Sequence, residues 1–316
     1  MKPTLISLFS GAGGMDLGFK KAGFDIIWAN DNFLDATETY KINIGHEIDS
    51  RGIEEIPVES LPKVDVVVGG FPCQGFSVAN TKRTVDDKRN TLYRYFIDTV
   101  KATKPKIFVA ENVKGILSLG DGEVIKKIVN DFADCGYEVR HHLFNTADYG
   151  VPQTRQRVII FGVRKDLNLQ AQFPPAPTHS RDGGGRFKKY VTIGEILEKI
   201  PNPDTQHDLK NHVYSKFKQK FNGYISNRVV DPNKPSPTVT ARGDEKGGAM
   251  IINHPFAPRR LSCRELASVQ SFPLDFEFYG SMTSIYRQIG NAVPPLFAET
   301  IARVVRDTLT HPKVYF

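Results

Sequence analysis

Near its start the chain runs Leu5-Ile6-Ser7-Leu8-Phe9-Ser10-Gly11-Ala12-Gly13-Gly14 and continues into Met15-Asp16-Leu17-Gly18. The apolar residues Leu5–Phe9 predict a buried strand, and the glycines after them predict a tight turn into a helix. Glycines at such a turn let backbone amides approach a ligand, and the amino terminus of a helix favours an anion. The stretch therefore indicates an α/β fold with a ligand at the carboxyl end of its first strand.

Asp31 ends the next predicted strand, about 20 residues after Gly11, where an acidic residue accepts hydrogen bonds from ribose hydroxyls. The glycines do not follow the spacing Gly-x-Gly-x-x-Gly, which weakens a nicotinamide dinucleotide as the ligand. An adenosyl ligand whose anion is an amino-acid carboxylate fits as well.

Short apolar runs alternate with helical patterns through the first half of the chain, which indicates a doubly wound, mainly parallel sheet. Gly136 follows the last of these helices, where a C-cap glycine is expected. The predicted strands are Leu5–Phe9, Asp25–Ala29, Val64–Gly69, Lys106–Ala110, Tyr137–Phe144 and Arg157–Val163, and the predicted helices are Met15–Lys21, Leu34–Lys41, Thr91–Thr103 and Glu123–Asp134.

The alternation breaks at the proline cluster Phe173–Pro177, and the chain then becomes polar and turn-rich to about Pro258. Ser262 and Glu265 form a capping box that opens a helix to Ser271, and a final amphipathic helix covers Pro295–Leu309. We therefore expect a larger domain from residues 1–175 plus 285–316, and a smaller domain with a hinge from residues 176–284.

The net charge of +7 lies in one segment. Residues 176–260 hold 15 Lys and Arg against 8 Asp and Glu, and the rest of the chain is balanced. A localised basic segment is typical of a nucleic-acid binder, and a merely solvated, lysine-rich face is the equal alternative. No stretch is long and apolar enough for a transmembrane helix, so we expect no membrane partner and a cytoplasmic location.

Cys73 follows the predicted strand Val64–Gly69 in the sequence Gly70-Phe71-Pro72-Cys73-Gln74. It is either a small buried hydrophobe or a nucleophile at the edge of the sheet where ligands bind. The other cysteines, Cys135 and Cys263, lie at helix ends and are expected to be structural. The three cysteines show no Cys-x-x-Cys spacing, so no disulfide framework and no metal site is expected.

Three more charged residues follow or begin predicted strands. Glu111 follows the strand Lys106–Ala110, so it is expected beside Cys73 as an acid that assists a nucleophile. Arg155 and Arg157 begin the strand at Arg157 and should share a face, because side chains in a strand repeat every two residues. They could bind a phosphate or lower the pKa of a thiol, or they could form a solvated strand end.

Taken in order, these motifs resemble those of the DNA (cytosine-5)-methyltransferases of bacterial restriction–modification systems. The resemblance covers nearly the whole chain except a variable segment from about Ala176 to Lys234. It rests on six stretches: Phe9–Gly14, Gly70–Gln74, Glu111–Val113, Gln153–Arg157, Arg264–Ala267 and Gln288–Pro294.

The resemblance implies the fold of S-adenosylmethionine-dependent methyltransferases with a smaller DNA-recognition domain in residues 176–284. It also implies that Cys73 attacks carbon 6 of cytosine, that Glu111 contacts N3 and the exocyclic amine, and that Arg157 helps hold the base. Arg155 would support the active-site loop and a phosphate. The base must leave the duplex stack, and Gln74–Asn90 resembles the loop that closes over it.

The implied cofactor is S-adenosyl-L-methionine, and the implied main partner is double-stranded DNA. A cognate restriction endonuclease would act on the same site without a stable complex, and the enzyme would be a monomer. The implied cofactor residues are Phe9, Ser10, Gly11, Ala12, Gly13, Gly14, Asp31, Asn32, Ile53, Pro72, Asn291, Ala292 and Val293; the implied DNA contacts are Gln74, Ser77, Thr238 and Arg242.

One position departs from the family. An Asp-Ile pair often contacts the adenine amine there, whereas this chain has Gly52 where the carboxylate would fall, with Asp49 as the substitute. Three other functions compete with DNA methylation. A tRNA-methylating relative should carry Cys-Phe-Thr, and no cysteine here is followed by Phe-Thr. The glycine spacing and the basic segment argue against an oxidoreductase, and the retained catalytic residues argue against an inactive DNA-binding module.

Overall fold

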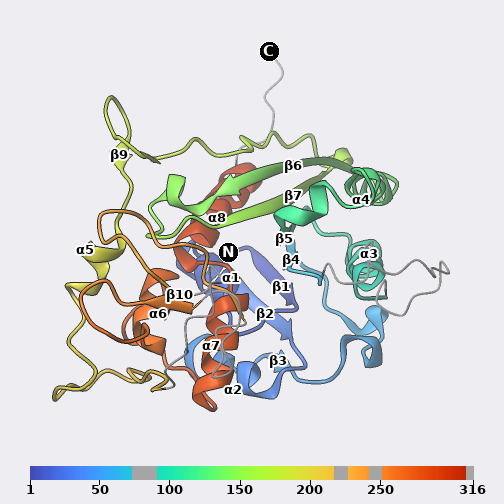
Figure 1. Cartoon of the computed structure of the whole chain (residues 1–316). Coiled ribbons are helices and arrows are strands. Elements are labelled where there is room, and N and C mark those ends of the chain that lie inside the picture. Colours follow the sequence, from blue (N-terminus) through green and yellow to red (C-terminus); the bar gives the residue numbers. More distant parts are fainter. Residues whose placement is uncertain (73–90, 217–226, 242–250, 311–316) are drawn as a thin grey trace.

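A computed structural model describes residues 1–72, 91–216, 227–241 and 251–310 of the chain. It is built around one seven-stranded sheet with the strand order β3-β2-β1-β4-β5-β7-β6 (Figure 1). All neighbouring strands are parallel except β7, which runs antiparallel to β5 and β6. The predicted α/β fold with a mainly parallel sheet is confirmed. The strands are β1 (Thr4–Leu8), β2 (Asp25–Asn30), β3 (Ile48–Asp49), β4 (Val66–Gly69), β5 (Ile107–Val113), β6 (Tyr137–Asn145) and β7 (Gln156–Arg164).

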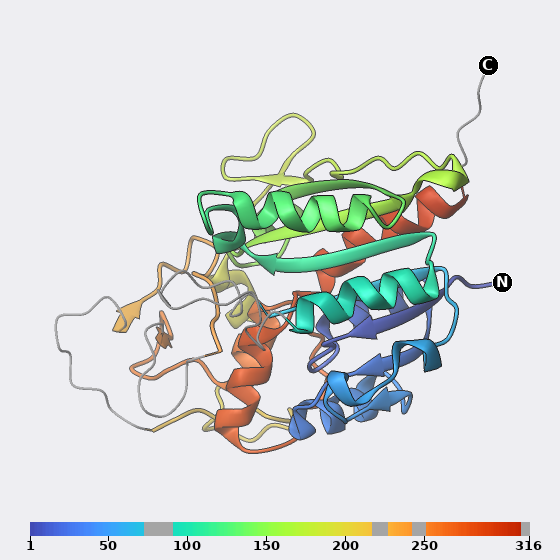
Figure 2. The same cartoon turned by 90° about the vertical axis from the view of Figure 1, so that its right-hand side faces the viewer.

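Helices cover both faces of this sheet, because its strands are apolar on both sides. Along β4, Val66 and Val68 face a core that includes residues of α1 and α8, while Val67 faces a core that includes residues of α3 and α4. Figure 2 looks onto the face that α3 and α4 cover. The bounds of these helices, together with α2 beside β2, are α1 (Gly14–Lys21), α2 (Leu34–Asn43), α3 (Thr91–Thr103), α4 (Glu123–Ala133) and α8 (Pro295–Thr310).

One glycine shows how closely this core is packed. Gly162 in β7 pairs with Phe108 in β5, and a Cβ atom at residue 162 would come within 1.9 Å of the Phe108 ring. The ring of Phe108 can therefore lie over β7 and stack on Phe132 of α4, with a distance of 4.2 Å between ring centroids. Any larger residue at position 162 would displace this aromatic contact.

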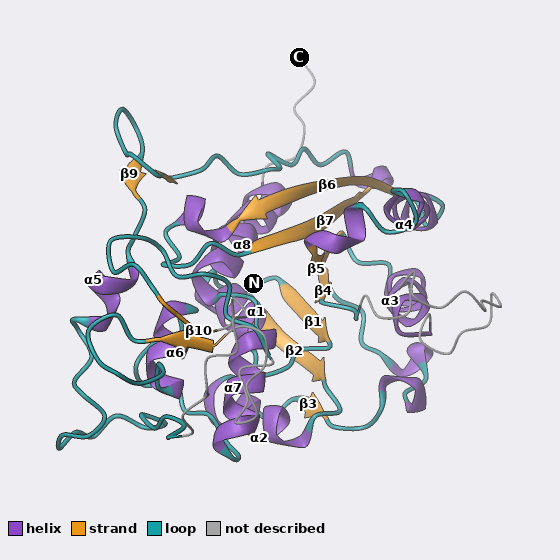
Figure 3. Ribbon diagram, viewed as in Figure 1, coloured by secondary structure: helices purple, strands orange, loops and turns teal. Residues whose placement is uncertain are grey.

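The polar part of the chain forms short elements joined by long loops, and most of them lie on the side of the molecule opposite α3 and α4 (Figure 3). A third core joins α5, α6 and α7 to Tyr40 and Ile44 of α2 and its C-cap, so residues of both expected domains share it. The boundaries of the two domains stay a prediction. The elements are β8 (His179–Ser180), β9 (Lys188–Lys189), α5 (Ile193–Leu197), β10 (Asn227–Val229), β11 (Ile251–Asn253), α6 (Cys263–Val269) and α7 (Met282–Asn291).

Most predicted elements are present, with shifted ends. The capping box of Ser262 and Glu265 is confirmed, although its helix ends at Val269 instead of Ser271. Strand β5 extends beyond the predicted Ala110 to Val113, because its polar end still pairs with β7. The prediction omitted the strands β3, β8, β9, β10 and β11 and the helices α5 and α7. Short 3₁₀ helices complete the fold at Ile53–Glu55 (η1), Val58–Ser60 (η2), Lys114–Leu117 (η5), Thr146–Tyr149 (η6) and Lys165–Leu167 (η7).

Two kinds of feature are absent from the described residues. They contain no helix long and apolar enough to cross a membrane. They also contain no cluster of three or more His, Cys, Asp or Glu side chains suited to a metal ion.

Candidate active site

A cavity of about 590 Å³ lies at the carboxyl ends of β1, β2, β4 and β5. Because these strands are parallel, their ends meet at one edge of the sheet, where α/β folds bind ligands. One further wall comes from α7 and the residues after it. Of the predicted cofactor residues, the lining includes Phe9, Ser10, Gly11, Ala12, Gly14, Asp31, Asn32, Ile53, Pro72, Asn291, Ala292 and Val293.

Gly13 is the predicted cofactor residue outside this lining, and it supports the loop from behind. It is the N-cap of α1 with a φ of 85°, and a Cβ atom there would come within 2.8 Å of Ile44. Gly14 allows an equally close approach on the other side, since its Cβ would lie 2.4 Å from the carbonyl oxygen of Val293. Glycine at both positions therefore lets the loop pack between α2 and the C-terminal segment.

Asp31 fixes the same loop from the end of β2. Its Oδ2 accepts a hydrogen bond from the Gly11 amide and its Oδ1 accepts one from the Phe33 amide, both at 2.8 Å. Burial raises the pKa of Asp31, and the two amides oppose this rise. A carboxylate has about four acceptor sites, so Asp31 can hold the loop and still accept hydrogen bonds from a ligand.

Glu111 and Arg157 meet at the end of the cavity formed by β5. The Arg157 Nε lies 2.7 Å from the Glu111 Oε1, and the two side chains are 13% and 12% exposed. Gly70 passes close to this pair, since a Cβ there would lie 3.1 Å from the Glu111 Oε2. Asn112 donates a hydrogen bond to the Phe71 carbonyl at 3.0 Å, which ties the segment before Cys73 to β5.

Four predicted site residues lie outside the described part of the chain: Cys73, Gln74, Ser77 and Arg242. Pro72, the residue before Cys73, lines the cavity together with Glu111. The residue before the predicted nucleophile therefore lines the same cavity as the predicted acid.

Arg155 differs from its expected position. Strand β7 begins at Gln156, so Arg155 precedes the strand, and the two-residue repeat does not place it beside Arg157. Its side chain is 1% exposed and lines neither of the cavities described here. The guanidinium donates hydrogen bonds to the carbonyls of Val239, Gly290 and Ala292, at 2.7, 2.9 and 3.0 Å. It supports the cavity wall from inside the protein, and no exposed part of it faces a phosphate.

A second cavity of about 560 Å³ adjoins the first at Val113. Its lining includes Lys114, Arg157 and Thr238, and it contains no acidic side chain. The Thr238 hydroxyl donates to the Thr154 carbonyl at 2.8 Å, so the predicted DNA contact lies against the start of β7. Such a polar, cationic hollow beside Arg157 can hold a phosphate group.

Two of the four charged residues that line the first cavity were not predicted from the sequence. The Arg287 guanidinium lies over the Phe33 ring, 4.5 Å from its centroid. Arg287 stands one helical turn before Asn291 in α7, so this spacing could have indicated it. Glu54 in η1 is the other missed residue. The suggested adenine contact Asp49 does not line the cavity, and its carboxylate binds Arg51, with 2.6 Å between Oδ2 and Nη2.

A buried acid lies directly behind the glycine loop. Asp16 of α1 is fully buried, and neither of its carboxylate oxygens has a hydrogen-bond partner among the described residues. The hydroxyl of the buried Tyr40 is unpaired in the same sense. Burial raises the pKa of Asp16 to about 7.

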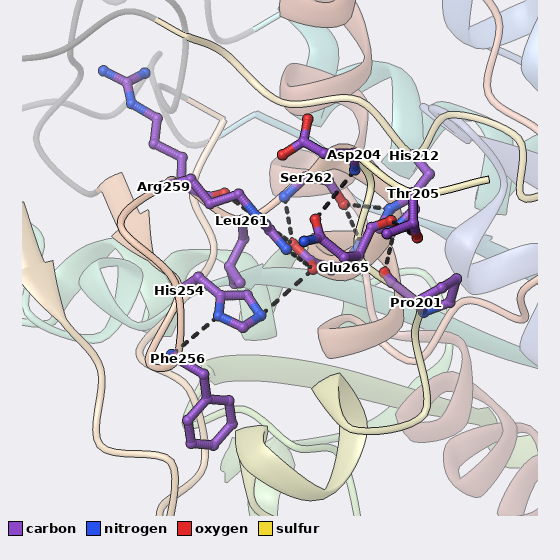
Figure 4. Close-up of polar contacts among 12 residues, drawn as sticks. Pro201, Asp204, Thr205, His212, His254, Phe256, Arg259, Leu261, Ser262 and Glu265 are labelled. Carbon is purple, nitrogen blue, oxygen red and sulfur yellow. Dashed lines mark hydrogen bonds and ion pairs between the residues drawn. The ribbon is translucent and has the colours of Figure 1, made fainter. Parts of the chain in front are cut away.

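A separate polar network joins loops of the polar segment that follows β7 (Figure 4). Glu265 accepts two hydrogen bonds from Arg259, both at 2.7 Å, and one from the Ser262 amide at 2.7 Å. Burial alone would raise the pKa of Glu265, but these partners hold it below its ordinary value. His212 bridges the Ser262 hydroxyl and the Pro201 carbonyl at 2.8 and 2.7 Å. The network joins three loop segments to α6, and it supplements the two short, two-stranded sheets of this part of the chain.

Comparison with known proteins agrees with this geometry. The family model of the C-5 cytosine-specific DNA methylases matches residues 4–307. The chain is 40% identical to the type II methyltransferase M.NgoFVII of Neisseria gonorrhoeae, covering 96% of this chain and 86% of that protein. It is 38% identical to the type II methyltransferase M.BsuRI of Bacillus subtilis, covering 97% and 80% of the two chains.

Solved structures share the fold. A prophage-encoded E. coli protein, described as a DNA modification methyltransferase, superimposes with a TM-score of 0.75 at 25% identity, covering 98% of this chain and all of that one. A mutant of Spodoptera frugiperda DNMT2 has a TM-score of 0.71 at 17% identity, covering 96% and 100% of the two chains.

Proposed function

This chain belongs to the family of C-5 cytosine-specific DNA methylases and is a DNA cytosine-5-methyltransferase, and we propose that it uses S-adenosylmethionine to methylate one cytosine within a short sequence of duplex DNA. The observation that carries the proposal is the position of Glu111. This residue lines the same cavity as Pro72 and the glycine loop, and it is held by Arg157. The acid, the neighbour of the predicted nucleophile and the predicted cofactor loop therefore converge on one space.

The residues present suit S-adenosylmethionine. The cavity of about 590 Å³ combines a glycine loop at the start of α1, whose amides suit a carboxylate, with Asp31, whose remaining acceptor sites suit ribose hydroxyls. Ala292 and Val293 would close the cavity from the C-terminal side. When bound, this cofactor supplies an electrophilic methyl group at its sulfonium.

The protein's own task is to make carbon 5 of cytosine reactive. We expect the Cys73 thiolate to add to carbon 6, and Glu111 to hydrogen-bond or protonate N3 as negative charge develops on the ring. Arg157 would hold Glu111 and help hold the base. Loss of the proton on carbon 5 would later break the bond between sulfur and carbon 6, which restores the thiolate.

Because a stacked base cannot be reached from this cavity, the target cytosine would leave the duplex. The basic residues 176–260 would contact phosphates and bases, and Thr238 and Arg157 would lie near the phosphate of the displaced nucleotide. The proposal includes residues 176–284 as the recognition domain, a monomeric enzyme in the cytoplasm, and a cognate endonuclease that shares the site without forming a stable complex.

Transfer of labelled methyl groups from S-adenosylmethionine to plasmid DNA, with bulk tRNA as the competing substrate, tests the proposal. DNA should be labelled and tRNA should not. Duplex DNA containing 5-fluorocytosine at the target should form an adduct that survives denaturation, because fluorine cannot leave as a proton.

Cys73→Ala should abolish both labelling and adduct formation while the protein remains folded. Substantial activity in this variant, or no adduct with the unmodified enzyme, would contradict the mechanism. Bisulfite sequencing of DNA from an expressing host would identify the site.

A further inference from the structure

We propose that Glu54, whose carboxylate lies beside Gly52, recognises the exocyclic amine of the cofactor's adenine. The inference rests on the proposed use of S-adenosylmethionine and assigns one more specificity residue in the same cavity.

Three carboxylates line the cavity, and two of them are already occupied. Asp31 accepts hydrogen bonds from the amides of Gly11 and Phe33, and Glu111 pairs with Arg157. Glu54 is exposed and has no hydrogen bond or ion pair with any residue in the described part of the chain. It is therefore the lining carboxylate with all of its acceptor sites available.

The absence of a side chain at Gly52 makes room for this carboxylate. A Cβ atom at residue 52 would lie 3.0 Å from the Glu54 Cδ and 3.1 Å from its Oε1. Since real Cβ atoms rarely approach oxygen so closely, a larger residue at position 52 would push the Glu54 carboxylate away. Gly52 and Glu54 thus act together, and Glu54 supplies the acidic group at this end of the cavity.

The turn that carries Glu54 is held in place on both sides. The buried Asn30 donates two hydrogen bonds of 2.9 Å, to the carbonyls of Asp49 and Arg51, which fixes the segment to the end of β2. Ile53 is 3% exposed and faces the cavity. The Glu55 carboxylate accepts a hydrogen bond from the Gly52 amide at 3.2 Å. Glu54 lies between these two anchored residues, so its backbone is positioned before any ligand arrives.

The chemistry of adenine matches this arrangement. Its exocyclic amine is a donor, and an ionised carboxylate is solely an acceptor. The apolar surfaces of Ile53 and Phe33 also line the cavity and suit the faces of a flat ring. Asp49 cannot take the role as it stands, because Arg51 occupies its carboxylate with hydrogen bonds from both Nε and Nη2.

The test measures binding without turnover. The affinities of S-adenosylhomocysteine and of an analogue with purine in place of adenine, which lacks the amine, are measured by calorimetry for four proteins. The unmodified enzyme should prefer the adenine compound by about tenfold, the lower end expected for a hydrogen bond to a charged group at an exposed site. Glu54→Ala and Glu54→Met should bind the two compounds within about twofold of each other.

Glu59→Ala is the matched control, since Glu59 is an exposed, equally charged residue of the neighbouring η2 and lies outside the cavity lining; it should keep the tenfold preference. If Glu54→Ala and Glu54→Met both keep the preference for adenine, Glu54 does not read the amine and the inference fails. If the unmodified enzyme binds neither compound, the proposed cofactor itself is wrong. Thermal unfolding of each variant checks that it is folded, and Glu54→Met retains the length of the side chain should the alanine variant be unstable.

Discussion

Arg157 and Glu111 form an ion pair across the antiparallel strands β7 and β5, with 2.7 Å between Nε and Oε1. They are diagonal neighbours, because Arg157 pairs in register with Val113, two residues along β5 from Glu111. Only one carboxylate oxygen is used in this contact, and the other lies on the side of Gly70. The pair therefore fixes the orientation of Glu111 and leaves an oxygen to face a substrate.

Glu111→Gln should lower the methyl-transfer rate by about a hundredfold or more and change DNA affinity by less than about threefold. The reason is that, in the proposed mechanism, the carboxyl group acts mainly as charge develops on the ring, so the variant loses an interaction of the transition state. Single-turnover methylation and equilibrium DNA binding measure the two effects. Comparable losses in both would make Glu111 a ground-state contact.

Arg155→Ala should destabilise the protein by about 3 kcal/mol or more, because the buried Val239 and Gly290 carbonyls lose the guanidinium and the Ala292 carbonyl keeps only Gln270 as a donor among the described residues. Denaturant unfolding measures the change. Arg140→Ala is the control: Arg140 is an exposed arginine paired with Glu138, and its loss should change stability by less than about 0.5 kcal/mol. A cost no larger than that of the control would mean that the carbonyls find other partners.

Asp16→Asn should remove the part of the pH dependence of stability that comes from the Asp16 carboxyl group. Burial raises the folded-state pKa of Asp16 from 3.8 to about 7, so between these values the folded protein holds a proton that the unfolded chain has lost. Stability therefore falls as the pH rises from about 4 to about 7, by up to about 4 kcal/mol. The asparagine variant lacks this loss.

Unfolding of both proteins at pH 5 and pH 8 measures the effect. The stability of Asp16→Asn relative to the unmodified protein should increase from pH 5 to pH 8. An equal difference at the two pH values would show that Asp16 does not titrate in this range. Histidines titrate in the same range in both proteins, so their contribution cancels in the comparison.

Neutralising Lys188 or Lys216, both exposed, should weaken binding to all DNA sequences similarly and reduce the salt dependence by about one released ion. Binding to specific and unrelated duplexes over a range of salt concentrations measures both quantities. Lys126, which is exposed on α4 and paired with Glu123, serves as the control. Loss of affinity for the specific duplex alone would mean that these lysines read bases.

Exchanging residues 176–260 for the corresponding segment of a relative should change the methylated sequence and leave cofactor affinity unchanged. The segment carries the whole excess of positive charge, while the lining of the first cavity comes from residues outside it. Bisulfite sequencing and binding of S-adenosylhomocysteine are the two measurements. A folded, active chimera that still modifies the original site would place specificity elsewhere.

The sequence is a good guide to the sheet because its strands are short apolar runs between turn residues, and α3 has the bounds predicted from its periodicity. It was a poor guide where polar residues continue a strand. Glu111 and Asn112 resemble a loop by composition, yet they pair with β7. The sequence alone predicts that residues at the carboxyl ends of parallel strands lie together. Most of the site residues predicted in this way line the cavity.

The role of Arg155 could not be predicted in the same way. Its partners Val239 and Gly290 are 84 and 135 residues away, and they accept through backbone carbonyls, which have no signature in the sequence. Glu54 was missed for a related reason: its significance depends on the space left by Gly52, which only the folded turn reveals.

The wall contributed by Arg287, Gln288, Asn291, Ala292 and Val293 links the cavity to the order of synthesis. A ribosome releases the glycine loop early and these residues late, after all seven strands of the sheet and before α8. Any polypeptide that stops before α7 would contain the sheet but lack this wall and the carbonyls that hold Arg155. Translation must therefore pass residue 293 before the whole lining of this cavity is present.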